Sequence, residues 1–341
     1  MAITNFIPEV WAAQLLGILD KNLVYAGAPC VNRNYEGEIA NYGDTVHIVS
    51  IADPTIVDYT KDTDLSVQTL TDDELLLLID QAKAFAFEID DIDMRQARSG
   101  GALMAEAARR AAFGLRDKAD QHVRDRMLIG AKSTNTLGLI DASSTSTNVY
   151  DQLLVPAAVK LDEANVPSEG RFIVLPPSVY GKLMLDSRFI KLNEGGTAAL
   201  HNGMVGDAAG FRILKSNNAT KASTAVAGTY ATKVFTAASA AGQVFGQDLV
   251  GQTIATKKVT AVTPTTLTFS ASVTLTSTVT LPARQSVVAG SSIATSYAEQ
   301  ISKVEAFRPE KRFADALKGL HLYGSKVVRG EALVAGAVKT S

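Results

Sequence analysis

The sequence of 341 residues is long enough for about two compact units, since one domain typically takes ~150 residues. Hydrophobic residues make up 46% and charged residues 20%, a balance that is typical of globular proteins and excludes intrinsic disorder and collagen-like order. The net charge of −2 gives no overall basicity that would indicate nucleic-acid binding. The single cysteine, Cys30, excludes an intrachain disulfide and any multi-cysteine metal site, and it fits a reducing cytoplasm.

The sequence shows no export or membrane signal. Its first residues lack a basic start, and Glu9 interrupts their apolar stretch, so they do not read as a signal peptide. The longest unbroken apolar run, Leu75 to Ile79, is far shorter than the ~20 residues that span a bilayer. We therefore expect a soluble protein without membrane contact.

The N-terminal region from Pro8 to Leu23 is predicted to form an amphipathic helix. A proline suits its first turn, and large apolar residues recur every four positions, at Trp11, Leu15, Leu19 and Leu23. Such a stripe near the end of a chain packs either on its own domain or on a neighbouring subunit.

A β-rich region follows the first helix. Two strand-like segments, Thr45–Val49 and Leu75–Ile79, flank a polar stretch with the sequence DYTKDTD at residues 58–64. We expect a long, partly exposed β-hairpin with a charged tip. A two-stranded ribbon is only marginally stable by itself, so it needs a partner surface. Phe85, Phe87 and Ile89 then alternate along one face of a further strand.

A long helix is predicted from Ser99 to Ile129, closed by Gly130. Thirty residues would make a rod of roughly 45 Å. Its apolar stripe has four-residue spacing: Leu103, Ala107, Ala111, Leu115, Ala119, Val123 and Met127. Most basic residues fall off this row: Arg109, Arg110, Arg116, Lys118, Arg124 and Arg126. A solvated helix face explains these charges better than a basic inner patch at Arg109, Arg110 and Arg116.

The rest of the chain divides into three segments. Residues 149–211 read as α/β, with strands at Phe172–Leu175 and Phe211–Leu214 around proline-started helices. Residues 219–285 are rich in Thr, Ser, Ala and Val, alternate polar and apolar positions, and contain a single acidic residue, Asp248. They predict a small inserted β-unit whose core includes Phe235, Phe245 and Phe269. Two more strands follow, near 301–307 and 319–328, on either side of a charged turn.

No catalytic or metal-binding constellation is present in the sequence. The four histidines, His47, His122, His201 and His321, lack metal-ligand spacing, and each reads as a surface or hydrogen-bonded residue. GAKST at 130–134 lacks the pattern of a phosphate-binding loop. The acidic run DDID at 90–93 suits a hard cation, but a solvated turn before a helix explains it better. We expect no catalytic residue, no metal and no cofactor.

Six stretches, in this order and spacing, resemble the major capsid proteins of tailed bacteriophages, which have the Hong Kong 97-like fold. They are MAITNFIPEVWAAQLL, NYEGEIANYGDTVHI, DYTKDTDL, LLIDQAKAFAFEIDDID, LDEANVPSEGRFIVLPPSVYGKLM and YAEQISKVEAFRPEKRFADALKGLHLYGSKVVR. The resemblance covers nearly the whole chain except residues 219–285. It implies an α+β fold with an N-arm, an extended β-hairpin loop, a peripheral domain with a long spine helix, and an axial domain.

The resemblance also assigns boundaries to these parts. The N-arm would be 1–35, the extended loop 36–80, the peripheral domain 81–135 and 301–341, and the axial domain 136–218 and 286–300. The inserted β-rich domain, 219–285, is assigned from its composition and not from the resemblance. The resemblance places Trp11 on the N-arm and Lys61 and Asp62 near the loop tip, where they would contact other subunits. Arg308, Glu310 and Arg312 form either a solvated turn, which stabilises little, or a contact at a subunit junction, where their charges would set register. Composition alone does not decide between the two, and we take the subunit contact as the hypothesis. Some relatives join subunits by a lysine–asparagine isopeptide, but no partner for Lys61 can be assigned, so no crosslink is predicted.

The implied function is that of a coat protein whose hexamers and pentamers close into the icosahedral head of the virion around double-stranded DNA, assembled in the host cytoplasm. The implied partners are a separate scaffolding protein, a portal and a decoration protein, with DNA bound non-specifically. Two alternatives stay open: an encapsulin-like compartment that holds a cargo enzyme, and a surface protein whose threonine-rich unit binds glycans or cells. The insert would either decorate the outer surface or brace neighbouring subunits.

Overall fold

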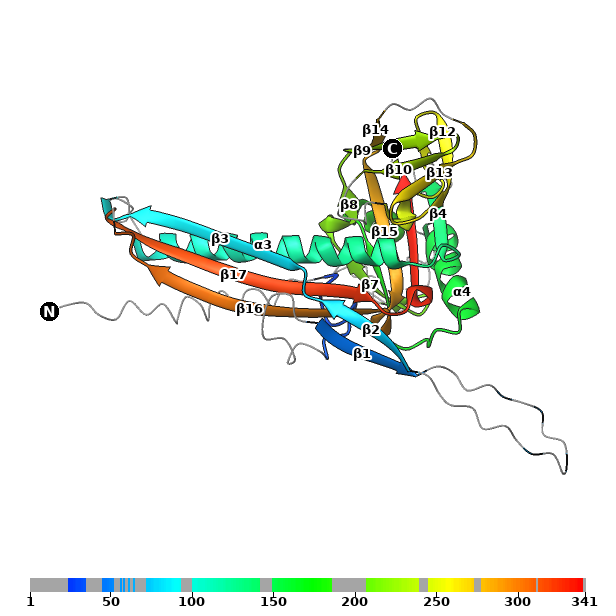
Figure 1. Ribbon diagram of the computed structural model, residues 1–341, viewed down its shortest axis with the longest axis horizontal. Helices are drawn as coiled ribbons and strands as arrows, with labels where there is room; N and C mark the ends of the chain where they lie inside the picture. The colour runs from blue at the N-terminus through cyan, green and yellow to red at the C-terminus, as the bar shows by residue number, and fades with distance from the viewer. Residues whose placement is uncertain are drawn as a thin grey trace.

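The structure is a computed structural model that describes residues 24–34, 45–51, 56, 58, 61, 64, 72–92, 100–141, 149–185, 207–238, 245–272, 277–310 and 312–339. The predicted N-terminal helix with Trp11, and also Asp62, lie outside the described residues. The described chain has a long ribbon of three strands with a helix beside it, which leads into a compact part with two further sheets (Figure 1). A short two-stranded hairpin lies below the junction.

The ribbon consists of β3 (Gln81–Asp90), β17 (Ala314–Val327) and β16 (Thr295–Phe307), with β17 in the centre. Both pairings are antiparallel, and a bulge interrupts the β16 register between Ile301 and Lys303. The helix α3 (Gly100–Gly130) runs along the ribbon. Its 31 residues correspond to about 46 Å, so it connects the free end of the ribbon to the compact part.

The compact part is built on a seven-stranded sheet. Its order is β4 (Thr136–Asp141), β18 (Leu333–Lys339), β15 (Arg284–Ser291), β5 (Arg171–Leu175), β7 (Phe211–Lys215) and β6 (Asp207–Ala208), and β8 (Thr220–Lys221) also pairs with β15. A π-helical turn, η2 (Tyr150–Leu154), leads into α4 (Val155–Glu163), and α5 is Pro177–Met184. Pro156 lies in the first turn of α4, where a proline is tolerated.

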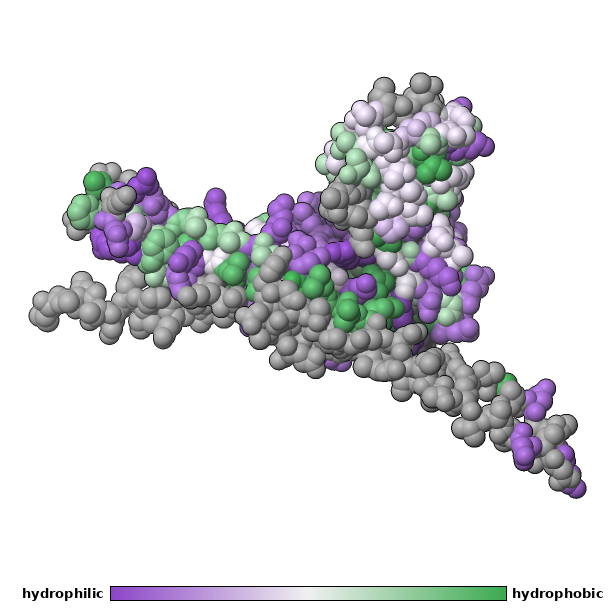
Figure 2. Space-filling model, viewed as in Figure 1, coloured by the Kyte–Doolittle hydropathy of each residue, from purple (hydrophilic) through white to green (hydrophobic). Residues whose placement is uncertain are grey.

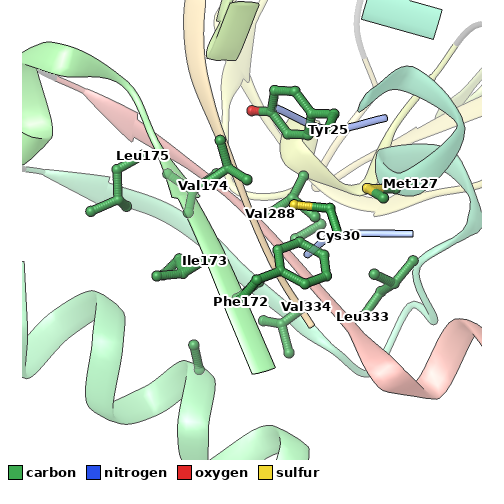
Figure 3. Packing of buried hydrophobic residues seen from close by; sticks show 14 of the residues in the cluster. Tyr25, Cys30, Met127, Phe172, Ile173, Val174, Leu175, Val288, Leu333 and Val334 are labelled. Carbon is green, nitrogen blue, oxygen red and sulfur yellow. The ribbon is translucent and has the colours of Figure 1, made fainter. Parts of the chain in front are cut away.

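The largest hydrophobic core lies where this sheet, α3, α4 and α5 meet. β5 is buried along its whole length, which is the pattern of a strand covered on both faces. Figure 3 shows Tyr25 and Cys30, from the segment 24–34, packed into this core near Met127, Phe172 and Val288. The segment after the N-terminal region is therefore part of the main core.

One strand differs from the predicted division. We expected residues 301–341 to stay with the ribbon, and β17 does, but β18 lies inside the seven-stranded sheet between β15 and β4. Its apolar run from Leu333 to Val338 is fully buried, and such a run is stable only in the middle of a covered sheet. The last described strand therefore lies in the compact part.

The hairpin consists of β1 (Thr45–Ile51) and β2 (Asp72–Leu78), which pair antiparallel, as predicted. β2 is attached to the ribbon base through Leu77 and Ile79, which pack on Ala298 and Leu322. The hairpin points away from the free end of the ribbon (Figure 1). Its attachment supplies the partner surface that a two-stranded ribbon requires.

The third sheet, here called the threonine-rich sheet, comprises β9 to β14 within residues 224–281. Its order is β11 (Thr253–Ile254), β12 (Lys257–Val262), β13 (Thr266–Phe269), β10 (Val234–Ala237), β9 (Thr224–Ala231) and β14 (Thr278–Leu281). The edge strands β11 and β14 also contact each other, so the sheet curls around its own core. That core includes the three predicted phenylalanines, Phe235, Phe245 and Phe269.

The buried side of α3 contains charges that the sequence placed outside. Leu115, Ala119, Val123 and Met127 are buried as predicted, but Arg116, Asp120 and Arg124 are buried too. Assigning Arg116 to a solvated face or a basic inner patch was therefore wrong, because α3 packs on several strands and turns and its covered face is wider than one apolar row. In the described part of the chain, no helix combines the length and apolar character needed to cross a membrane.

Candidate functional site

The free end of the ribbon is braced by ion pairs within the chain. Arg308, after β16, pairs with Asp91 and lies 3.9 Å from a carboxylate oxygen of Asp315. Arg312, before β17, pairs with Glu88 on β3. The antiparallel register of β3 and β17 brings these groups together, because it places Ala314 opposite Asp90. Two of the predicted contact residues thus hold the ribbon end of their own subunit together.

The same end exposes large apolar side chains. Phe313 is 80% exposed, Ile92 is 64% exposed and Phe307 is 43% exposed. The Lys318 ammonium lies 5.1 Å from the ring centroid of Phe307 and 2.8 Å from a carboxylate oxygen of Glu305. Figure 2 shows hydrophobic colour at the ribbon end among hydrophilic side chains. Apolar side chains rimmed by charges are the usual composition of a protein-binding surface.

The remaining predicted contact residues are not gathered at one place. Glu310 is exposed at the ribbon end and forms no ion pair with another described residue. Lys61 is exposed between β1 and β2, whose hairpin points away from that end, and Trp11 and Asp62 lie outside the described residues. The predicted contact residues that the structure describes therefore belong to separate surfaces rather than to one site.

A shallow groove on the ribbon was missed by the sequence reading. It has a volume of about 530 Å³ and is lined by Phe85, Leu320 and alanines, with Glu305 and Lys318 at its rim. Gly319 makes it possible, since a Cβ atom at this position would lie 2.4 Å from the Phe85 ring. The alternating pattern in the sequence identified Phe85 as a strand residue. Only the register of β3 and β17 shows that a glycine lies opposite it.

A buried carboxylate fixes the segment that follows the N-terminal region. Asp120 on α3 accepts hydrogen bonds from the backbone N–H groups of Val24, Tyr25 and Ala26 at 3.0, 2.7 and 3.2 Å. Its other oxygen accepts one from the Asn218 side chain at 3.0 Å. Burial raises the pKa of Asp120, and these hydrogen bonds oppose that rise. Asp120 thereby joins three distant parts of the chain.

A second buried network holds the same segment to the ribbon base. Arg33 pairs with Glu299 on β16, which also accepts a 2.6 Å hydrogen bond from the Tyr297 hydroxyl. Nε2 of the fully buried His321 lies 3.1 Å from the same carboxylate. Burial raises the pKa of Glu299, but its hydrogen bonds and Arg33 outweigh burial and lower it. These contacts hold the segment 24–34 against the ribbon base.

A partly buried histidine makes stability depend on pH. Burial and the nearby Arg126 lower the pKa of His122 to about 4, and its ring packs edge-on against Tyr323 at 5.4 Å. Because the folded state favours the neutral ring, its contribution is complete above pH 6.5 and is lost as the pH falls toward 4. We expect the free energy of unfolding to drop by about 1–2 kcal/mol from this group between pH 6.5 and 5.

Urea denaturation at pH 7.5, 6.5 and 5.0 measures this effect. His122→Phe keeps a ring against Tyr323 without the titration, so its unfolding free energy should depend less on pH than that of the natural chain. Equal pH slopes for the two proteins would show that His122 is not the responsible group.

Within the described residues, no group of His, Cys, Asp or Glu side chains is arranged to hold a metal ion.

Comparison with known proteins agrees with this architecture. A family model described as phage capsid protein matches residues 76–262, more than half of the chain. No match is found among curated protein sequences. A solved chain of Mycobacterium phage Che8 is 24% identical, with a TM-score of 0.57 over 99% of each chain. The capsid structure of cyanophage P-SCSP1u is 17% identical, with a TM-score of 0.57 over 94% of this chain and 89% of that one.

A third similar structure is the mature capsid of bacteriophage PhiM1, 14% identical, with a TM-score of 0.55 over 87% of this chain and 82% of that one. Structural likeness at such identities establishes the fold, and the family model establishes the membership. Both agree with the resemblance seen in the sequence. The chain therefore belongs to the phage capsid protein family: it is a major capsid protein with the Hong Kong 97-like fold, a structural subunit of the virion head.

Proposed function

We propose that copies of this chain associate as hexamers and pentamers and close into the icosahedral head of a tailed phage around double-stranded DNA. The observation that carries this proposal is the ribbon end, where Phe313, Phe307 and Ile92 are exposed on a rigid, ion-paired support. Exposed apolar groups favour association, because burying them in a contact lowers the free energy by about 25 cal/mol for each Å² of apolar surface.

In this proposal the contacts between subunits come from several surfaces. The ribbon end contributes Glu310 and the apolar side chains, while Arg308 and Arg312 brace it and face the neighbour from its rim. Lys61 and Asp62 at the loop and Trp11 on the N-arm extend to other copies. The anchoring of the segment 24–34 by Asp120 and Glu299 supports this arrangement, because a fixed starting point directs the arm.

The finer division of the chain belongs to the same proposal. The threonine-rich sheet has its own strand order and its own core, which supports an inserted β-rich domain at about 219–285. The ribbon and α3 would form the peripheral domain, and the seven-stranded sheet the axial domain, with its last strand supplied by the C-terminal segment. A separate scaffolding protein, a portal and a decoration protein are the proposed partners, with DNA contacted non-specifically.

Electron microscopy of the purified chain, with and without a co-expressed scaffolding protein, tests this function. We expect closed shells, or capsomers with aberrant polymers. Shells that contain a protein cargo and exclude DNA in an infected host would favour the compartment alternative. A monomer that stays unchanged with the scaffolding protein would contradict the proposal.

A substitution at the ribbon end separates assembly from folding. Phe313→Asp should change the free energy of unfolding by no more than about 0.5 kcal/mol, because the side chain is exposed in the subunit. It should strongly reduce the yield of shells in light-scattering and sedimentation assays, since a charge would enter an apolar contact. Lys326→Asp, at an exposed position of β17 near the ribbon base, is the matched control. Equal shell yields for Phe313→Asp and the natural chain would rule out this contact.

A further inference from the structure

The threonine-rich sheet carries an unbalanced positive charge. Residues 219–285 contain five basic residues and one acidic residue, a net charge of +4. The whole chain has a net charge of −2, so the other residues together carry −6. A surface that serves only solubility usually mixes both signs. This separation of charge within one chain therefore calls for another explanation.

The basic residues near the compact part are already paired. Asp248, the single acidic residue of the segment, is fully buried and binds Arg284 at 2.5 Å. Lys221 binds Asp125 on α3 at 2.7 Å. Both pairs lie where the threonine-rich sheet joins the rest of the subunit, so they attach the sheet. Because Asp248 is already paired, the segment has no acidic group left that could neutralise its other lysines.

The other three lysines, Lys233, Lys257 and Lys258, gather at the end of the sheet remote from this junction, here called the lysine end. β9 starts at the junction and ends just before the turn that carries Lys233. Lys257 and Lys258 come directly after the turn between β11 and β12. The backbone carbonyl groups of Lys233 and Lys258 accept hydrogen bonds from the adjacent residues Phe269 and Ser270 at 2.8 and 2.9 Å. The two lysines therefore lie on either side of β13.

None of these three lysines forms an ion pair with a described residue, and Lys233 and Lys258 are exposed. The turns that carry them are held in left-handed backbone conformations at residues other than glycine: Thr232 has φ 55°, Ala255 48° and Thr256 71°. Such conformations are disfavoured, most of all for a β-branched residue. The tyrosine hydroxyl of Tyr230 donates to the carbonyl oxygen of Thr232 and braces one turn. The lysine end is thus a defined cationic surface.

We propose that the lysine end docks on the acidic surface of a neighbouring copy of this chain and braces the shell. The complement is available, because the rest of each copy carries −6 and its compact part exposes carboxylates such as Glu163, Glu169 and Asp207. Identical lysine ends repel one another, so the contact is made between unlike surfaces. Each exposed ion pair stabilises little, but every copy in a shell repeats the contact. The inference rests on the proposed shell function.

A zero-length carbodiimide crosslink tests the contact directly, because it joins a lysine to a carboxylate only when the two touch. Shells are assembled from an equal mixture of isotopically light and heavy chains, crosslinked, and analysed by mass spectrometry. We expect mixed-isotope crosslinks from Lys233, Lys257 or Lys258 to Asp- or Glu-containing peptides. Shells that form normally but give no such crosslinks, or link these lysines only to a different protein, would overturn the inference. A failure to form shells at all would instead contradict the proposed function.

A matched pair of variants measures the contribution to stability. In the triple variant Lys233→Gln, Lys257→Gln, Lys258→Gln, the free-subunit concentration in equilibrium with shells should rise about tenfold at low salt, as expected for three exposed pairs. The difference from the natural chain should shrink as salt screens the charges. Lys118→Gln, an exposed lysine on α3, should leave the concentration unchanged. The same rise for Lys118→Gln, or no rise for the triple variant, would contradict the docking.

Discussion

Replacing Asp248 with alanine is expected to destabilise the subunit by about 3–5 kcal/mol, one of the largest effects of any single substitution. The carboxylate is fully buried and accepts hydrogen bonds from Arg284 at 2.5 Å and from Ser286 at 2.7 Å. Burial raises its pKa, but Lys221, Arg284 and the hydrogen bonds outweigh burial and lower the pKa to about 2. Alanine would leave the Arg284 guanidinium, itself only 7% exposed, without its counter-charge.

Urea denaturation followed by circular dichroism measures this loss, and two variants serve as controls. Asp248→Leu with Arg284→Met removes both charges and should recover most of the stability, because the cost comes from the unpaired charge. Glu106→Ala breaks an exposed pair with Arg110 on α3 and should cost at most about 0.5 kcal/mol. A loss for Asp248→Ala no larger than that of Glu106→Ala would refute the role assigned to the pair.

The depressed pKa of Asp248 also makes its contribution to stability depend on pH. The contribution is present above about pH 4 and is lost as the pH falls toward 2.

Replacing Asp120 with alanine is expected to cost about 3 kcal/mol or more, since each buried donor left without an acceptor costs about 1–3 kcal/mol. Alanine would leave the N–H groups of Val24, Tyr25 and Ala26 without this acceptor. Asp120→Asn keeps one acceptor oxygen. Because burial raises the pKa of Asp120, removing the charge relieves part of the burial cost, so asparagine should cost only about 1 kcal/mol.

Thermal and urea denaturation compare the two variants with Asp117→Ala, which changes a carboxylate on a more exposed face of the same helix. The rate at which a thiol reagent labels Cys30 gives a local reading, because this single cysteine is buried in the segment that Asp120 holds. We expect faster labelling in Asp120→Ala and near-natural labelling in the other two. Indistinguishable labelling and stability in all three would show that Asp120 does not anchor the segment.

Local patterns predicted most of the elements of this fold. Four-residue apolar spacing predicted α3 to within a residue of its C-terminal end. Alternation predicted β3, and short strand-like or apolar runs predicted β1, β2 and β5. Their pairing could be inferred only where a short connection imposes it, as in the β1–β2 hairpin. β18 shows the limit, because its apolar run fits any covered strand, and its place between β15 and β4 depends on contacts distant in sequence.

The candidate contact residues show the same limit. The mixed charges of the turn at 308–312 left open whether Arg308 and Arg312 are solvated or lie at a subunit contact, and their partners, Asp91 and Glu88, lie more than 200 residues away. Only the β3–β17 register reveals that these arginines brace their own ribbon. The buried charges of α3 were missed because a helical row identifies an apolar stripe and not the width of the covered face. Composition marked Asp248 as the single acid of a long segment, but its burial and its pair with Arg284 follow only from the structure.

The central claim is that the ribbon end is completed by a neighbouring copy. A near-atomic electron cryomicroscopy reconstruction of the assembled shell measures this directly, through the solvent exposure of Phe313, Phe307 and Ile92 in each copy. The account predicts that these side chains are buried against another subunit, while Arg308 and Arg312 keep their pairs with Asp91 and Glu88. Ribbon ends that stay open to solvent in every copy of a closed shell would contradict it.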